Sequence, residues 1–180
     1  MRLDKFLANM GVGTRTEVKH LLKKGKVTVN TSVEKSPKSH INPTEDIVHV
    51  NGKQVEFVNN VYIMLNKPKG YISATHDESN RTVIDLIPEY QHLNIFPVGR
   101  LDKDTEGLLL ITNDGQFSHD LMSPSKHVSK TYEVTSKKPV TKVDIDAFKK
   151  GIILSDGPVK PAQLTRINET ISVSYTHLTL

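Results

Sequence analysis

The sequence contains no cysteine and no long apolar run. Without cysteine, the 180-residue chain has no disulfides, no thiolate metal ligands and no thiol nucleophile, which fits a reducing compartment. No apolar stretch approaches the roughly 20 residues that a membrane span requires. The N-terminus, MRLDKFLANMG, has no apolar segment of signal-peptide length. We therefore expect a cytoplasmic protein that does not cross a membrane.

Patterns typical of metal sites and of phosphate-binding loops are also missing. His119 and Asp120 are adjacent, but neither their spacing nor a third ligand supports a metal site. No glycine-rich phosphate loop is present, because Gly13, Gly25 and Gly70 are each explained by a turn. The sequence therefore predicts neither a bound metal nor a cofactor.

The positive charge is confined to the first third of the chain. Hydrophobic residues make up 36% of the sequence, which permits a packed core, and the net charge is +4. Residues 1–60 hold ten Lys and Arg against six Asp and Glu, whereas residues 61–180 hold fourteen of each. This asymmetry favours a small polyanion-binding module joined to a neutral domain. Chance combined with solubility is the other explanation.

Local patterns in the first sixty residues predict two short helices and a small sheet. Apolar residues recur with helical spacing within 3–10 and again within 18–22. Between them, Thr14 and Glu17 form the pattern of a capping box. Asn51-Gly52 separates two short alternating runs and predicts a hairpin.

Basic residues gather around these two helices. Lysines on a helix are often only a solvated face, so the pattern alone leaves that interpretation open. The alternative is contact with a polyanion, as the charge asymmetry suggests. The residues concerned, which the family resemblance given below makes the candidates for RNA binding, are Arg2, Lys5, Arg15, Lys19, Lys23, Lys24 and Lys26.

The rest of the chain predicts more strands than helices, in meander order. Strands are expected at 61–66, 71–73, 108–112, 130–134, 152–154, 163–167 and 171–173, with a helical turn at 82–87 and helices at 116–122 and 143–150. The predicted class is α+β: a small helix–helix–sheet domain at 1–58, followed by a mainly antiparallel sheet domain with flanking helices at 59–180.

One stretch, VGRLDKDTEGLLLITNDG (98–115), places acids next to a buried strand. Asp102, Asp104 and Glu106 stand just before the apolar run 108–111. They could be the solvated charges of a turn, or one could be a carboxylate held at a strand edge for chemistry. Paired carboxylates would also suit a glycosidase, although a basic polyanion-binding module is an odd partner for sugar hydrolysis.

Longer motifs resemble two known families. The order RLDKFLA, TRTEV and LLKKGKVTVN, within residues 1–52, resembles the RNA-binding module first seen in a bacterial small-subunit ribosomal protein. The segments NKPKGYIS (66–73), IFPVGRLDKDTEGLLLITNDG (95–115) and KTYEV (130–134) resemble the pseudouridine synthases that act on ribosomal RNA. Together they resemble the small-subunit type, the RsuA family.

This resemblance implies an isomerase that converts a specific uridine in ribosomal RNA to pseudouridine without a cofactor. It makes Asp102 the catalytic residue, leaving open whether the carboxylate attacks the sugar, attacks the base or acts as a base. Arg100 is expected to contact the RNA backbone or to fill the gap left by the flipped base. Tyr132 is expected to stack on the uracil and to help remove the carbon 5 proton, with an ordinary half-buried strand tyrosine as the alternative. Lys130 is either an RNA contact or an exposed strand charge. The expected partner is small-subunit ribosomal RNA or its assembly intermediate, bound by a monomer.

The C-terminal residues depart from the family pattern. After the strand near 171–173, the resemblance implies a Gly-and-basic segment carrying a cation that pairs with Asp102. Here the chain reads SYTHLTL (174–180), which offers no such cation. We therefore expect a truncated or replaced C-terminus and a catalytic domain that lacks one wall of its active site. The alternative function is a non-catalytic protein that binds ribosomal RNA; a DNA-binding or translation-linked regulator is a more distant one.

Overall fold

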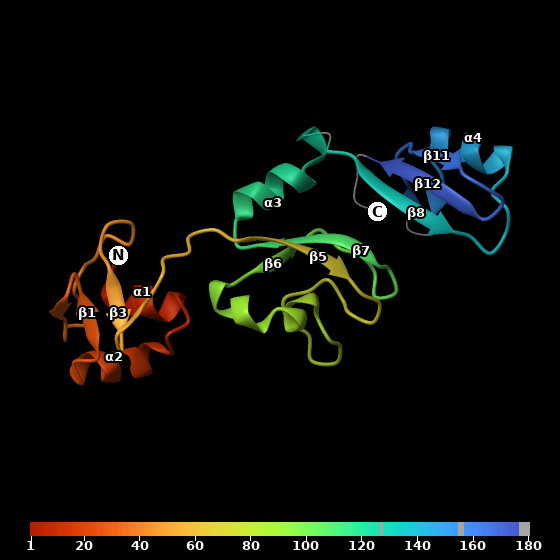
Figure 1. The fold of residues 1–180 in the computed structure, drawn as a ribbon. Helices are drawn as coiled ribbons and strands as arrows, with labels where there is room; N and C mark the ends of the chain where they lie inside the picture. Colours follow the sequence, from red (N-terminus) through yellow and green to blue (C-terminus); the bar gives the residue numbers. More distant parts are fainter. Residues whose placement is uncertain (127, 155–156, 177–180) are drawn as a thin grey trace. The chain divides into compact units, whose positions relative to one another are not determined.

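The computed structural model describes residues 1–126, 128–154 and 157–176 (Figure 1). This part of the chain forms two compact units. The first comprises residues 1–97 and 101–114, and the second comprises residues 98–100 and the described residues from 115 onward. Seven strand ladders are antiparallel, and helices accompany the sheets, which confirms the predicted α+β class. The boundary predicted between residues 58 and 59 falls inside the first unit and stays a prediction.

The N-terminal part of the first unit is built from two helices and a four-stranded sheet (red to orange in Figure 1). The sheet has the order β2-β1-β3-β4. One hydrophobic core joins the apolar helix stripes to Val27 and Val48 of the sheet, which explains the spacing of the apolar residues. The elements are α1 (Leu3–Asn9), α2 (Arg15–Lys23), β1 (Val27–Val29), β2 (Ser32–Val33), β3 (Val48–Val50) and β4 (Lys53–Gln54).

Two local signals in this part are confirmed. The Thr14 hydroxyl accepts a hydrogen bond from the Glu17 amide at 3.3 Å, and the Glu17 carboxylate accepts one from the Thr14 amide at 2.7 Å. This capping box satisfies two amides at the start of α2 that have no partner within the helix. Asn51 and Gly52 both have positive φ angles, 51° and 80°, as a tight hairpin between β3 and β4 requires.

A second hydrophobic core lies under the other sheet of the first unit, whose order is β5-β7-β6. Alternation along the strands sends Leu65 and Leu109, which are register partners, into this core. Met64 and Leu108 point to the opposite face and are exposed. The elements are β5 (Tyr62–Lys67), the short 3₁₀ helices η1 (Val83–Leu86) and η2 (Pro88–Leu93), β6 (Phe96–Val98) and β7 (Gly107–Thr112).

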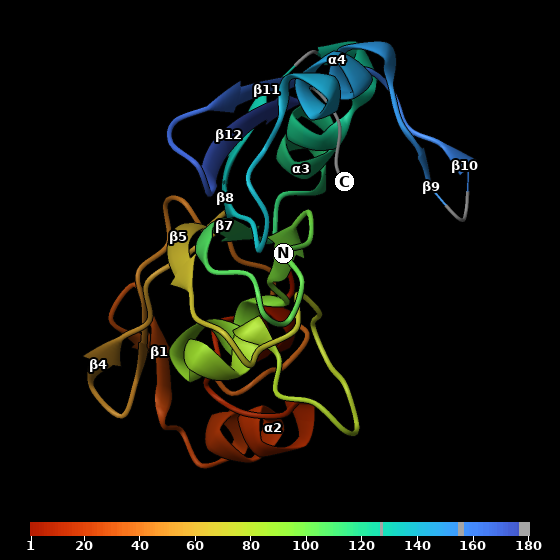
Figure 2. The ribbon, with the colours of Figure 1, turned by 90° about the vertical axis from the view of Figure 1, so that its right-hand side faces the viewer.

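The second unit is a three-stranded sheet with helices and a short ribbon. The sheet has the order β11-β12-β8, and α4 packs against β11. Figure 2 shows the β9–β10 ribbon extending beside α4. The elements are α3 (Gly115–Met122), η3 (Pro124–Lys126), β8 (Lys130–Thr135), α4 (Lys142–Lys150), β9 (Ile153–Leu154), β10 (Gly157–Pro158), β11 (Gln163–Arg166) and β12 (Ile171–Thr176).

Two predictions about strands need correction or comment. The strand predicted at 71–73 is wrong, because Ile72 forms only a single bridge, to Thr82, and the residues that follow it form a bend. The strand predicted at 171–173 continues to Thr176, so the first part of the unusual C-terminal sequence pairs with β8. Residues 177–180 of that sequence lie outside the described residues.

Among the helices described, none is long and apolar enough to span a membrane.

Candidate active site

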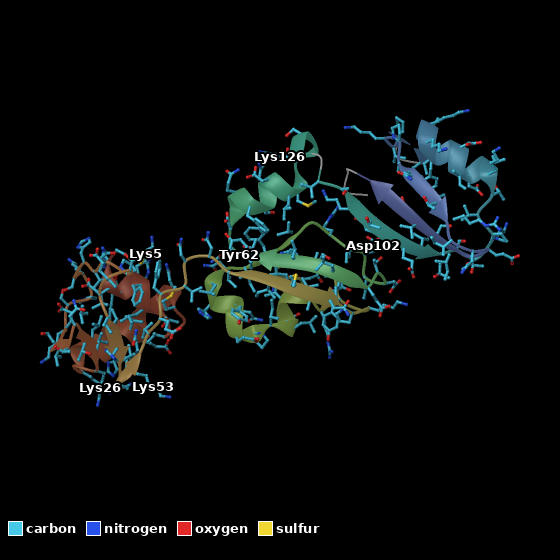
Figure 3. All side chains as sticks on the ribbon, turned by 45° about the horizontal axis from the view of Figure 1, so that its top comes forward. Lys5, Lys26, Lys53, Tyr62, Asp102 and Lys126 are labelled. Atoms are coloured by element: carbon cyan, nitrogen blue, oxygen red, sulfur yellow. The ribbon has the colours of Figure 1, made fainter. Side chains whose placement is uncertain are left out.

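The three acids lie in the loop between β6 and β7 of the first unit. Asp102, Asp104 and Glu106 are all exposed, and Asp102 is labelled in Figure 3. Glu106 forms an ion pair of 3.8 Å with Lys69, and because both side chains are exposed this pair contributes little stability. The loop therefore presents carboxylates to solvent beside β7, a strand with one buried face.

A buried lysine holds the backbone of this loop. Lys67 ends β5 and has a relative exposure of 0%. Its ammonium group donates hydrogen bonds to the carbonyl oxygens of Asp102 at 2.8 Å and Thr105 at 2.7 Å. Longer contacts of 3.3 Å reach the carbonyl oxygens of Pro68 and Lys103. A buried cation is tolerated when its donors are satisfied, so the loop carbonyls act as a cage for the ammonium group.

Two opposing effects act on this cation. Burial lowers the pKa of Lys67 below its ordinary value of 10.5, while the carboxylates of Asp102, Asp104 and Glu106 act to raise it. Burial is the larger effect, so the net shift is downward. The loop that carries the acids is thus folded around a desolvated positive charge.

The segment that follows Lys67 adds two more anchors to the loop. Gly70 donates a hydrogen bond from its amide to the carbonyl oxygen of Lys103 at 2.8 Å. Gly70 has a φ of +89°, a backbone conformation that residues with a Cβ atom rarely adopt. The Ser73 hydroxyl is bonded to both the amide and the carbonyl oxygen of Leu101, each at 2.9 Å. The segment 67–73 therefore contacts the loop before, at and after Asp102.

Tyr132 stands on β8 in the second unit and faces a cavity of about 970 Å³ within that unit. Its side chain is partly buried, and burial raises the pKa of the phenol above its ordinary value of 10.0. Ser174, its register partner on β12, lines the same cavity. Ser172 also lines it, and the Oγ atom of this residue is buried without a hydrogen-bond partner in the structure. Because its pKa is raised, the Tyr132 phenol is protonated at neutral pH.

The other predicted substrate residues lie in the second unit as well, whereas Asp102 lies in the first. Arg100 is exposed. Lys130 is partly buried, and its ammonium group donates to the carbonyl oxygens of Leu121 at 3.0 Å and Val128 at 3.1 Å. Lys130 therefore ties the start of β8 to the end of α3, and its contact with RNA stays a prediction.

The predicted RNA-binding residues of the N-terminal part are exposed. Arg15, Lys19 and Lys23 follow one another at intervals of four residues on α2, so they share one face of the helix. Arg2 differs, because its guanidinium group forms two hydrogen bonds, of 3.0 and 2.7 Å, with the buried carboxylate of Asp4. Figure 3 labels Lys5 and Lys26 on this part of the chain; the exposed set is Arg2, Lys5, Arg15, Lys19, Lys23, Lys24 and Lys26.

Sequence reasoning missed the roles of Lys67 and Ser73. The run NKPKGYIS was interpreted as a turn and a strand, and nothing in it signals that its first lysine is buried.

Within the described ranges, no group of three or more His, Asp or Glu side chains could hold a metal ion.

Comparison with known proteins identifies both parts of the sequence. Residues 61–177 match the RNA pseudouridylate synthase family, and residues 1–48 match the S4 domain. The chain belongs to the RNA pseudouridylate synthase family. The predicted family resemblance and the predicted enzyme class, an isomerase acting on RNA, are thereby confirmed.

Relatives of this synthase include proteins named for both ribosomal subunits. It is 48% identical to an uncharacterized RNA pseudouridine synthase, YtzG, of Bacillus subtilis over 91% of this chain and 69% of the relative. It is 40% identical to ribosomal large subunit pseudouridine synthase B of Bacillus subtilis over 90% of this chain and 66% of the relative. It is also 40% identical to ribosomal small subunit pseudouridine synthase A of Vibrio cholerae, over 94% of this chain and 74% of the relative.

A solved structure supports the same family. The crystal structure of a pseudouridylate synthase matches with a TM-score of 0.61 and 31% identity, over 99% of this chain and 77% of that one. The synthase described here spans about two thirds of the length of its two Bacillus subtilis relatives.

Proposed function

We propose that this synthase isomerises a specific uridine of ribosomal RNA to pseudouridine, with Asp102 as the catalytic residue and without a cofactor. The bond between N1 of uracil and C1′ of ribose breaks, the base turns, and C5 joins C1′. The proton on C5 passes to solvent and N1 gains a proton, so atoms and electrons balance without an oxidant or an energy source. Such a reaction needs one ionised carboxylate aimed at the sugar–base bond.

The observation that carries this proposal is the anchored backbone at Asp102. The Lys67 ammonium group donates directly to the carbonyl oxygen of Asp102, and the Thr105 amide donates to the same oxygen at 3.0 Å. A carboxylate on a fixed backbone loses little further freedom when substrate binds, which is the advantage of a preorganised site. An ordinary solvated turn has no need of a buried cation beneath it.

We also assign three residues of the second unit to substrate binding. Tyr132 offers an aromatic ring and a protonated hydroxyl group, which suit stacking on uracil and donation to it. We assign Arg100 and Lys130 to the RNA backbone around the target nucleotide. Extruding that nucleotide from a paired region costs a few kcal/mol. The cations of the N-terminal part offset this cost by binding phosphates.

The proposed substrate is small-subunit ribosomal RNA or its assembly intermediate. The S4 match supports RNA binding, and relatives are named as pseudouridine synthases of the large or the small ribosomal subunit. Because relatives named for the large and the small subunit are equally similar, at 40% identity, the test uses both RNAs. A ribosomal RNA substrate places the activity in the cytoplasm, and the proposed reaction requires only one chain.

Pseudouridine mapping at nucleotide resolution tests this function. We expect the 180-residue chain to introduce pseudouridine at a specific position of unmodified small-subunit RNA. Asp102→Asn abolishes the product but not RNA binding, and the control Asp104→Asn retains both. Product formation by Asp102→Asn contradicts the assignment of the catalyst. Salt-dependent binding of both RNAs without product contradicts the enzyme proposal and favours the non-catalytic alternative, which no comparison supports.

A further inference from the structure

The Ser73 side chain makes an unusual pair of contacts with the residue that precedes Asp102. Its Oγ atom donates a hydrogen bond to the carbonyl oxygen of Leu101 and accepts one from the amide of the same residue, both at 2.9 Å. One hydroxyl group thus satisfies both backbone groups of Leu101. Neither Ser73 nor Leu101 belongs to a strand, so no sheet ladder holds this position instead.

These contacts complement those of Lys67 on the other side of Asp102. The carbonyl oxygen of Leu101 belongs to the peptide group before Asp102, and the carbonyl oxygen of Asp102 belongs to the peptide group after it. Ser73 binds the first of these and Lys67 binds the second. Because peptide groups are planar, fixing both of them fixes the backbone torsions of Asp102 and hence the direction of its Cα–Cβ bond.

We propose that Ser73 is a positioning residue, which aims the Asp102 carboxylate by clamping the Leu101 peptide. The proposal rests on the function proposed above, in which Asp102 is the catalyst. Ser73 does not touch the reacting atoms in this assignment; it acts through the backbone. Misplacing a reacting group by about 1 Å costs a rate factor on the order of 100, so a lost clamp affects turnover more than binding.

The hydroxyl group of Ser73 can be tested separately from its bulk. Ser73→Ala removes the hydroxyl, whereas Ser73→Thr keeps it. Ser79→Ala is the matched control, because Ser79 lies six residues further along the chain and is exposed. Its backbone amide, and not its hydroxyl group, forms a hydrogen bond, to the Asp77 carboxylate. Each chain is assayed by tritium release from C5-labelled uridine in unmodified small- and large-subunit ribosomal RNA, which yields kcat and KM separately.

We expect Ser73→Ala to lower kcat by about 10- to 100-fold with KM unchanged, since RNA binding depends on other surfaces. Ser73→Thr and Ser79→Ala retain the wild-type kcat. A wild-type kcat for Ser73→Ala overturns the proposal. Equal losses of kcat in Ser73→Ala and Ser73→Thr also overturn it, because the hydroxyl group is then not responsible.

Amide hydrogen exchange separates this proposal from the proposed function. In Ser73→Ala we expect exchange of the Leu101 amide to accelerate about tenfold, while exchange in α2 stays unchanged. If the wild-type chain makes no pseudouridine, the proposed function fails, and the exchange rate still reports whether Ser73 clamps the loop. An unchanged Leu101 exchange rate in Ser73→Ala overturns the clamp whatever the activity.

Discussion

The ammonium nitrogen of Lys67 lies 2.8 Å from the carbonyl oxygen of Asp102 and donates a hydrogen bond to it. This contact joins the last residue of β5 to a residue 35 positions later in the sequence. The loop that carries the acids beside the apolar run at 108–111 thus folds its backbone carbonyl groups around a buried cation. The acid loop and its support therefore form one structural element in the first unit.

Replacing Lys67 by methionine is expected to destabilise the first unit. The methionine fills similar space but removes the ammonium donor from the carbonyl oxygens of Asp102 and Thr105, and only the Asp102 oxygen keeps another donor, the Thr105 amide. An unpaired buried polar group costs about 1 to 3 kcal/mol. We expect the free energy of unfolding to fall by about 2 to 5 kcal/mol in urea titrations. Lys69→Met is the control, because Lys69 is exposed and its ion pair is weak. Equal stability of both variants would contradict the cage around Lys67.

The sequence predicted those features whose signals are local. The capping box at Thr14 and Glu17 and the hairpin at Asn51-Gly52 depend on residues no more than three positions apart, and both are confirmed. Strands β5 and β7 were also expected within about one residue, because alternation and apolar runs encode them. Hydrophobic patterning therefore sufficed for most of the framework.

The contacts of Lys67 and Ser73 with the loop at Asp102 could not be predicted from local patterns. Lysine in a Lys-Pro-Lys-Gly turn is ordinarily exposed, and only a loop from a distant part of the chain makes its burial tolerable. Ser73 was placed in a strand, but its side chain bonds Leu101 and its backbone does not join a sheet ladder. Asp102 itself was predicted from a family motif, and pseudouridine mapping with Asp102→Asn tests the proposed role.

Acid is expected to weaken the N-terminal part through Asp4. Hydrogen bonds from Arg2 hold the pKa of this buried carboxyl group below its ordinary value of 3.8. A lowered folded-state pKa means that the pair stabilises the fold above pH 3.8 and that this contribution is lost as the pH falls through the folded-state pKa. In urea titrations, Asp4→Asn should lose about 1 to 3 kcal/mol at neutral pH and converge with wild type in acid.

A matched variant controls this pH experiment. Glu56→Gln removes an exposed acid in the same part of the chain and should follow the wild-type curve. If Asp4→Asn and wild type stay equally far apart at every pH, the difference between them is a packing effect rather than a titration of Asp4.

The basic face of α2 is expected to set the salt dependence of RNA binding. Lys19 and Lys23 share this face, and each phosphate contact contributes a slope of about −0.7 to −0.9 in a plot of log K against log salt concentration. The double variant Lys19→Gln/Lys23→Gln should reduce the slope by about 1.5 in filter-binding titrations. Lys149→Gln/Lys150→Gln, at the end of α4, removes the same charge elsewhere and should leave the slope intact. Equal effects of both pairs would indicate net charge rather than contact.

Tyr132 is expected to contribute by stacking its ring on the uracil rather than by acting as a general base. Burial raises the pKa of its phenol, and a general base must be deprotonated, so removing the C5 proton is disfavoured for this group. We therefore expect Tyr132→Phe, which keeps the ring, to lower kcat by less than about tenfold. Tyr132→Ala should lower it by about 100-fold or more, because the stacking surface is lost and the cavity widens. Single-turnover rates on the mapped RNA distinguish the two variants. Equal, large losses in both would assign the function to the hydroxyl group, and a phenol with a raised pKa would then act as a hydrogen-bond donor to the base.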